Sequence, residues 1–372
     1  MTLEERLKER RICICAGSGG VGKTTTSAAI ALGLARRGRR VAVVTIDPAK
    51  RLATSLGLEE LDNEPRLVDP ALLEQAGVPV EGELWAMMLD AKRTFDELIA
   101  RLAPDERTRR DVLENRIYQE LSSAVAGSQE FTAVAKLFEL DRSGRFDAIV
   151  LDTPPSRSAL DFLDAPTRLT QFFEGRALKV FLAPTGLATR IVGRGASAVF
   201  SIFSKIAGVD LISDLSVFFR ALGGLIDGFR ERATSVSALL RDPATTFLVI
   251  TSPEREPSEE AIFFHRKLRE AGMPFGGLIV NRVHDQALDG HTAEQTAALL
   301  QPALGDALAQ RVAANLADFN VLAERDRRQI ERLKKSLAVK DPVLVPHLDA
   351  DVADLQALAT IEQHLFADAP ES

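Results

Sequence analysis

One stretch decides the fold of this 372-residue chain: Ala16-Gly17-Ser18-Gly19-Gly20-Val21-Gly22-Lys23-Thr24-Thr25-Thr26. It matches the pattern G-x-x-x-x-G-K-[ST] in full. In such a loop the glycines let backbone N–H groups turn towards phosphates, the lysine contacts the β and γ phosphate oxygens, and the threonine hydroxyl completes a magnesium shell. We therefore expect a bound nucleoside triphosphate, held by Gly19, Gly20, Val21, Gly22, Lys23, Thr24 and Thr25.

The sequence on both sides of this loop supports the same interpretation. Residues 12–15 form an apolar run typical of a buried strand, and residues 25–35 are rich in alanine and leucine, which favour a helix. A helix that starts directly after the loop points its N-terminus, which attracts anions, at the phosphates. This order of elements predicts an α/β fold, a P-loop NTPase with a mostly parallel, doubly wound sheet.

Four further apolar runs end in polar or turn residues: 41–46 before Asp47, 148–151 before Asp152, 278–280 before Asn281, and 343–345 before Pro346-His347. A single aspartate after a strand is more often a turn former or a helix cap. In an open parallel sheet, however, ligands bind beyond the carboxyl ends of the strands, so these residues would converge on the phosphate loop. Two carboxylates beside a triphosphate repel it unless a cation intervenes, which predicts Mg²⁺ near Thr24 and Asp152.

The bulk composition is that of an ordinary globular protein, with 46% apolar and 27% charged residues and a net charge of −7. This charge provides no basic field, so we expect no nucleic-acid partner. The N-terminal residues are too charged for a signal peptide and no long run lacks charge, which predicts a cytoplasmic location. The only two cysteines, Cys13 and Cys15, are interpreted as buried thiols that build no metal cluster.

Two lobes are expected. Residues 1–91, 146–160 and 241–372 would form the P-loop ATPase core, and residues 92–145 and 161–240 an inserted α-helical subdomain. Within the subdomain an apolar stripe repeats at alternating spacings of four and three: Leu211, Leu215, Phe218, Leu222, Leu225 and Phe229. Two interpretations stay open, an ordinary helical core or a groove that holds an apolar client helix.

Four ordered segments carry a resemblance to a known family: TIDPAK at 45–50, FDAIVLDTPP at 146–155, TSPE at 251–254 and IVNR at 279–282. They resemble the arsenite-pump ATPase (ArsA) family, which includes the targeting factor of the guided-entry pathway for tail-anchored membrane proteins. The resemblance implies a Mg²⁺-dependent ATPase that works as a homodimer or a heterodimer with a paralogue, with ATP at the subunit interface. It also implies an apolar client helix and a membrane receptor as partners.

The same resemblance implies a role for each matching residue. Lys23 and Asp47 would be catalytic, Asp47 by orienting the attacking water. Thr24 and Asp152 would hold the magnesium ion. At the other end of the nucleotide, Asn281 would contact the adenine, and Pro346-His347 would flank it.

The chain departs from the family's pattern in the phosphate loop, in the two switch segments and at the zinc-binding cysteines. The loop and switch changes resemble a bacterial branch. Ser18 stands where the family's loop usually carries a lysine that reaches the partner's ATP. Lys50 replaces the switch I histidine, and Arg157-Ser158 replace the glycine and histidine of switch II. The cysteine pair that clamps some family dimers through zinc is absent from the C-terminal third, so any dimer must hold without zinc.

Two alternative functions therefore remain. The first is an ATP-binding subunit of a hetero-oligomer with weak or no hydrolysis of its own, because a cation supplied in trans contributes on the order of 10³–10⁵ in rate. The second is a metalloid efflux ATPase, which would need a soft-metal site that two strand cysteines do not build.

Overall fold

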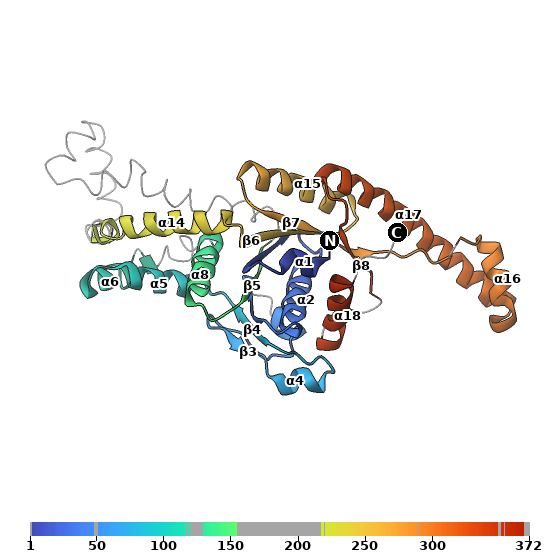
Figure 1. Ribbon diagram of the computed structural model, residues 1–372, viewed down its shortest axis with the longest axis horizontal. Helices are drawn as coiled ribbons and strands as arrows, with labels where there is room; N and C mark the ends of the chain where they lie inside the picture. The colour runs from blue at the N-terminus through green and yellow to red at the C-terminus, as the bar shows by residue number, and fades with distance from the viewer. Residues whose placement is uncertain are drawn as a thin grey trace, which may run out of the picture. The chain divides into compact units, whose positions relative to one another are not determined.

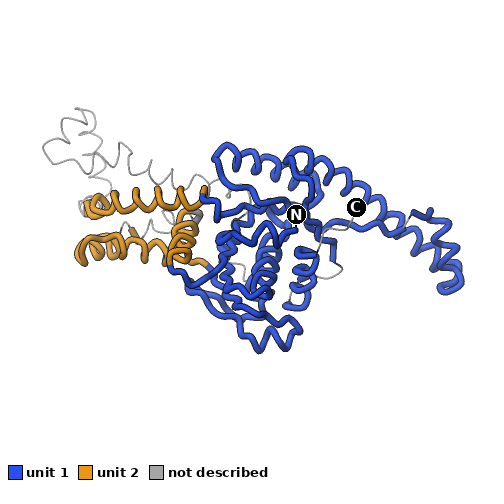
Figure 2. Tube along the Cα trace, viewed as in Figure 1, with its two compact units in different colours: residues 1–88, 143–159, 242–372 blue, residues 89–142, 160–241 orange. Residues whose placement is uncertain are grey.

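The computed structural model describes residues 2–47, 51–116, 118–119, 129–154, 217–218, 220–288, 290–348, 351–352 and 354–367. The chain divides into two compact units, coloured separately in Figure 2. Unit 1 comprises residues 1–88, 143–159 and 242–372, and unit 2 comprises residues 89–142 and 160–241.

Unit 1 is built on one eight-stranded sheet in the order β3-β4-β2-β5-β1-β6-β7-β8. Neighbouring strands are parallel except at one edge, where β3 runs antiparallel to β4. The strands are β1 (Ile12–Gly17), β2 (Arg40–Thr45), β3 (Arg66–Leu67), β4 (Glu83–Met88), β5 (Ala148–Asp152), β6 (Thr245–Thr251), β7 (Phe275–Val283) and β8 (Val343–Pro346). The mostly parallel α/β sheet expected from the sequence is therefore confirmed.

Helices cover both faces of this sheet (Figure 1). On one face α2 (Lys23–Arg36) and α18 (Leu355–Phe366) share a core with alternate side chains of the strands, such as Cys13, Val43 and Val150. On the other face α15 (Arg255–Glu270) contacts β1, β6 and β7, and α17 (Asp306–Leu337) contacts β7. Burial on both faces explains why the central strands are continuous apolar runs. The other helices of unit 1 are α1 (Leu3–Leu7), α3 (Arg51–Ser55), α4 (Pro70–Gln75) and α16 (Ala293–Leu304).

Unit 2 is helical in its described residues and has its own apolar core. Its helices are α5 (Ala91–Leu102), α6 (Glu106–Leu113), α8 (Gln129–Ser143) and α14 (Ile226–Arg241). Aromatic rings stack inside it, with the Phe95 and Phe229 ring centroids 5.7 Å apart. None of the helices within the described residues is long and apolar enough to cross a membrane.

The structure describes part of the apolar stripe of this unit. Phe218, Leu222, Leu225 and Phe229 are all at most 6% exposed and pack in one cluster with Phe95. These four side chains therefore belong to an ordinary helical core, which is the first of the two interpretations. Leu211 and Leu215 lie outside the described residues.

Candidate functional site

The phosphate loop joins the end of β1 to the start of α2. Two of its glycines have positive φ, 78° at Gly20 and 87° at Gly22, a region that side chains with a Cβ rarely adopt. Gly22 is also crowded, since a Cβ there would lie 2.4 Å from Asn281 Nδ2. Gly22 is also the N-cap of the 14-residue helix α2, so the loop ends at a helix N-terminus. The free backbone N–H groups of a helix N-terminus attract phosphate.

Lys23 extends back across this loop. Its side chain is nearly buried, at 8% exposure, and Nζ donates a hydrogen bond of 2.7 Å to the carbonyl oxygen of Ser18. Burial lowers the pKa of Lys23, while the negative charges of Asp152, Asp47 and Glu260 act in the opposite direction. A cation is thus held over the loop with three carboxylates around it.

Asp152, at the end of β5, faces the first turn of α2. Its Oδ2 atom accepts hydrogen bonds from Thr24 Oγ1 at 2.6 Å and from Thr45 Oγ1 at 2.9 Å. Its Oδ1 atom is buried and has no hydrogen-bond partner among the described residues. Burial raises the pKa of this carboxyl to about 6, against the lowering effect of those two hydrogen bonds and of Lys23.

These observations test whether the residues present fit a magnesium ion. Mg²⁺ prefers oxygen ligands, commonly one or two carboxylates together with phosphate oxygens and water. A buried carboxylate oxygen without a partner, beside a threonine hydroxyl and a phosphate-binding loop, offers that donor set. Thr24 and Asp152 therefore fit the ion that the sequence predicted.

Asp47 lies two residues beyond Thr45, just after β2 ends. Its backbone N–H donates to Thr45 Oγ1 at 3.1 Å, so one hydroxyl contacts both Asp47 and Asp152. Its carboxylate Oδ2 lies 4.0 Å from Arg51 Nη1, and its side chain is 33% exposed. Lys50 of the same segment lies outside the described residues, as do Arg157 and Ser158.

Asn281 contacts the phosphate loop directly. Its Nδ2 donates a hydrogen bond of 2.9 Å to the carbonyl oxygen of Val21, and the residue is 6% exposed. Pro346 and His347 follow on the neighbouring strand β8, where the His347 N–H donates to the Val283 carbonyl at 2.9 Å. The His347 ring stacks on His284, with ring centroids 5.2 Å apart.

The structure thus links Lys23, Thr24, Asp47 and Asp152 by hydrogen bonds or charge, and attaches Asn281 to the same loop. Pro346 and His347 contact β7 beyond Asn281, with no direct hydrogen bond to the loop among the described residues.

Sequence reasoning missed several residues of this site. The motif at 45–50 contains Thr45 but assigns it no role, although a hydroxyl two residues before Asp47 at the end of a strand is a usable signal. Glu260 on α15, which accepts a hydrogen bond from Ser18 Oγ at 2.5 Å, gave no signal in sequence. The same is true of the His284 ring, which Asp326 Oδ2 contacts at 2.7 Å.

Comparison with known proteins gives the family. A family model described as an anion-transporting ATPase, ArsA_ATPase, matches residues 10–301. An "ATPase ASNA1 homolog" of Cryptosporidium parvum is 26% identical over 74% of this chain and 66% of its own length. An "ATPase GET3" of Malassezia globosa is 25% identical over 76% of each chain. A "Putative arsenical pump-driving ATPase 1" of Aquifex aeolicus is 24% identical over 97% of this chain and 80% of its own.

The family model spans most of the chain, including the phosphate loop, both strand-end aspartates and Asn281. The resemblance read from the four sequence segments is therefore confirmed. This chain belongs to the ArsA family of anion-transporting ATPases.

Proposed function

We propose that this protein is a Mg²⁺-dependent ATPase that converts ATP and water to ADP and phosphate and works as a nucleotide-dependent dimer. The single observation that carries the proposal is the Asp152 carboxylate. It is buried, it is bonded to Thr24 of the phosphate loop, and its other oxygen lacks a partner among the described residues. An ordinary structural aspartate in a sheet core would have both oxygens satisfied.

The residues of the chain divide the work as follows. The loop N–H groups and Lys23 bind the β and γ phosphates and stabilise the charge that spreads over them during transfer. Thr24 and Asp152 hold Mg²⁺, which when bound neutralises charge on those phosphate oxygens. Asp47, more exposed and directly after β2, orients the attacking water.

At the adenine end, the Asn281 amide donates its N–H to the loop, which leaves the side-chain carbonyl as an acceptor for the exocyclic amine of the base. Pro346 and the His347 ring flank the base. The hydrogen bond between Asn281 and Val21 couples this end of the nucleotide to the phosphate loop.

ATP binding would close the dimer and hydrolysis would reopen it, so that the rate of hydrolysis would set how long the dimer stays closed. The output we propose is the chaperoning or targeting of an apolar membrane-protein helix to a membrane receptor. The support is membership of a family in which relatives named GET3 and ASNA1 are similar to this chain. The four described stripe residues are buried, so a client surface would have to involve other residues or another state.

A second candidate is an ATP-binding subunit of a hetero-oligomer with weak hydrolysis of its own. Ser18 favours it, because the residue is 7% exposed and carries no cation that could reach a partner's ATP. Its hydroxyl donates to Glu260 of the same chain. A metalloid pump is less favoured. Cys13 and Cys15 are buried in β1, and a hydrogen bond with Cys15 together with burial raises the pKa of the Cys13 thiol, which keeps it unreactive.

The test compares phosphate release and light-scattering mass for the wild type and the Asp47→Asn variant, with and without ATP and Mg²⁺. We expect Asp47→Asn to bind ATP and to lose turnover. At protein concentrations low enough for the nucleotide-free chain to be monomeric, its mass should double when ATP and Mg²⁺ are added. Lys23→Ala should lose turnover altogether, and the exposed Asp351→Asn serves as the matched control that behaves as the wild type.

Unchanged hydrolysis in Asp47→Asn would remove its assigned role. ATP binding without turnover in the wild type, and a mass that stays that of a monomer, would favour the hetero-oligomer subunit. Stimulation of hydrolysis by antimonite would restore the metalloid pump.

A further inference from the structure

Exposed apolar side chains gather on one part of unit 1. The segment of residues 293–322, here called the hairpin, comprises α16 and the first half of α17, which pack against each other. α16 has no buried residue. Of the nine large apolar side chains that are most exposed among the described residues, five lie on the hairpin: Leu299, Leu304, Leu308, Phe319 and Val321.

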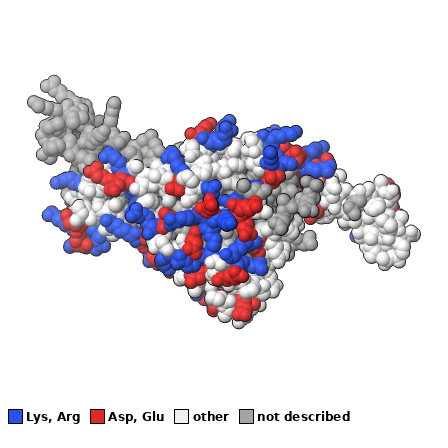
Figure 3. Space-filling view, in the orientation of Figure 1, with Lys and Arg blue, Asp and Glu red and all other residues white. Residues whose placement is uncertain are grey.

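The hairpin is also nearly devoid of charge. Its charged residues are Glu294, Asp306, Arg311 and Asp318. The next part of the same helix, residues 324–335, is dominated by Glu, Asp, Arg and Lys, as an exposed helix face usually is. Figure 3 shows the contrast, with the hairpin almost white at one end of the view. Such an apolar surface marks an interaction site rather than a solvated helix pair.

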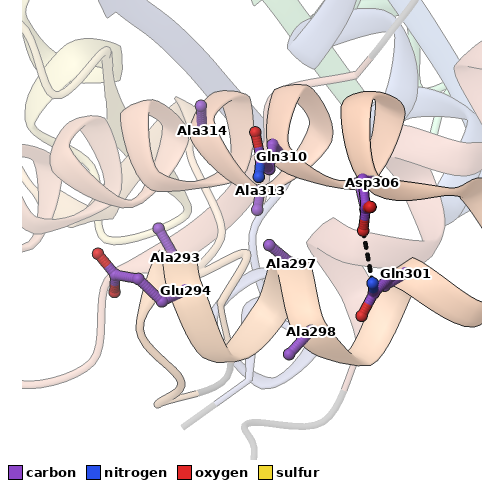
Figure 4. Close-up of a pocket in the computed structure, with 10 residues that line it drawn as sticks. Ala293, Glu294, Ala297, Ala298, Gln301, Asp306, Gln310, Ala313 and Ala314 are labelled. Atoms are coloured by element: carbon purple, nitrogen blue, oxygen red, sulfur yellow. Dashed lines mark hydrogen bonds between the residues drawn. The ribbon is translucent and has the colours of Figure 1, made fainter.

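The two faces of α17 within the hairpin differ. One face packs on α16 through small side chains, Ala309 and Ala313, each 1% exposed, and a cavity of about 490 Å³ lies between the helices (Figure 4). The opposite face carries a stripe at alternating spacings of three and four: Leu308, Arg311, Asn315, Asp318 and Leu322. The first four of these are exposed and Leu322 is partly exposed. A second helix can therefore pack along this face without disturbing α16.

The order of charges along this stripe is self-complementary. Arg311 and Asp318 lie two helical turns apart, and neither forms a hydrogen bond or an ion pair with another residue that the structure describes. A second copy of the helix can be placed antiparallel to the first, about a two-fold axis beside Asn315. Arg311 then lies opposite the partner's Asp318, and Asp318 lies opposite the partner's Arg311. The same axis places Leu308 opposite the partner's Leu322. A two-fold interface requires this reciprocity: if residue i of one copy contacts residue j of the other, then residue j of the first copy contacts residue i of the second.

We propose that the hairpin is a dimerisation surface whose occupant is the hairpin of a second copy of this chain. The two copies of α17 pack antiparallel, with two reciprocal Arg311–Asp318 ion pairs between apolar contacts. This inference deepens the proposed dimeric switch and rests on it for the second copy. An unrelated apolar helix or a lipid surface would cover the leucines equally well, but neither would match a positive and a negative charge two turns apart.

The test uses full-length protein without nucleotide, so that a failure of the ATPase proposal does not affect it. Light scattering and sedimentation are measured against concentration for the wild type, Arg311→Asp, Asp318→Arg and a mixture of the two variants. Each variant alone places like charges opposite each other twice, and we expect its dimer dissociation constant to rise at least about tenfold. The mixture pairs opposite charges at both positions, so dimers of mixed composition should recover wild-type affinity.

Arg328→Asp, an exposed charge reversal on the same helix away from the stripe, is the matched control and should dimerise as the wild type. Helical circular dichroism and ATP binding of each variant establish that it is folded. A wild type that is monomeric at every concentration would overturn the proposal, whether or not it floats with phosphatidylcholine vesicles. Dimers that are unchanged in both variants, or that fail to recover in the mixture, would overturn it as well.

Discussion

At the scale of single residues, Gly20 and Gly22 form a natural pair of tests within one loop. Both have positive φ, but a Cβ at Gly20 meets nothing within 4 Å, whereas one at Gly22 would lie 2.4 Å from Asn281 Nδ2. Gly20→Ala should therefore cost about 1 kcal/mol of stability, for backbone strain alone. Gly22→Ala should lower the free energy of unfolding by about 2–4 kcal/mol, because the added Cβ also overpacks the contact with Asn281. It should also weaken ATP binding more than Gly20→Ala does. Urea unfolding and ATP titration measure both effects.

Removing the opposing side chain separates the two causes. In an Asn281→Ala background, Gly22→Ala should become as mild as Gly20→Ala. An equal cost of the two glycine substitutions in the wild-type background would contradict the contact between loop and amide. The pair also shows whether Asn281 acts on the nucleotide alone or on the loop that holds it.

The sequence predicted the residues of this site whose position along the chain is diagnostic. Lys23 and Thr24 follow from the loop pattern, and Asp47, Asp152 and Asn281 from their places at strand ends. Glu260 could not be predicted, because it is 242 residues away from Ser18 in the sequence. The sequence of a helix does not indicate which distant residue a given side chain contacts. Contacts of this kind depend on how the elements pack.

At the scale of elements, the apolar runs predicted β1, β2, β5, β7 and β8, each near its observed position. The prediction missed β4 and β6, although β4 contains the apolar run Leu-Trp-Ala-Met-Met and β6 the run Phe-Leu-Val-Ile. It also missed the edge strand β3, which has only two residues. Edge strands are covered on fewer sides and need less apolar sequence. The helix expected from residue 25 begins at Lys23, because Gly22 in the left-handed conformation is its N-cap.

One ion pair links the starts of β2 and β5. Asp147 accepts hydrogen bonds from the backbone N–H and the guanidinium of Arg40, and these bonds lower the pKa of Asp147 to about 2. Because the folded pKa lies below the unfolded value of about 3.9, the stabilisation is present above that pH and is lost as the pH falls towards 2. The Asp147 side chain is 42% exposed, so screening limits the contribution to about 1 kcal/mol or less.

We therefore expect Asp147→Asn to lower the free energy of unfolding at pH 7 and to approach the wild type as the pH falls to about 2. Urea unfolding of both proteins between those pH values measures the difference. The exposed Asp351→Asn, which lies on no strand, should show no such convergence. A difference that is the same at both pH values would mean that the effect of Asp147 is not electrostatic.

The long helix α17 ends on a strained residue. Ala338, its C-cap, has φ 53° and ψ 38°, the left-handed conformation that usually carries glycine. The strain of a Cβ there, about 1–2 kcal/mol, exceeds the entropy of about 0.5–1 kcal/mol that a glycine loses on folding. Ala338→Gly should therefore stabilise the protein by about 0.5–1 kcal/mol in urea unfolding. Ser336→Gly, two residues earlier inside the helix, should instead destabilise it by about 0.5 kcal/mol, and the same sign for both would refute the argument.

At the scale of the whole molecule, the proposed ATP site and the proposed dimer surface both belong to unit 1, yet they place different demands on a second copy. The hairpin would hold two chains together without nucleotide, whereas the family resemblance places ATP between subunits. Dimerisation through the hairpin would raise the effective concentration of the two ATP sites, so that their closure becomes an intramolecular step. A chain that lacks a zinc clamp would then still keep its partner between turnovers.

We expect Ser18 to limit how fast such a dimer hydrolyses ATP. The resemblance implies a lysine at this place that acts on the partner's nucleotide, but here the Ser18 hydroxyl donates to Glu260 of its own chain. A lysine introduced by Ser18→Lys would meet that carboxylate first and form an ion pair within the subunit. We therefore expect Ser18→Lys alone to change steady-state phosphate release by no more than about threefold. Combined with Glu260→Gln, it should raise the rate at least about tenfold, towards the gain of about 10³–10⁵ that a cation supplied in trans can give.

Glu260→Gln without the lysine is the control and should give no gain, because it supplies no cation. The gain of the double variant should also depend on protein concentration where the dimer dissociates, since a cation in trans acts only when two chains meet. A full gain from Ser18→Lys alone would mean that Glu260 does not retain the lysine. No gain in the double variant would mean that the slow step lies elsewhere, and that the serine at this position does not limit the rate.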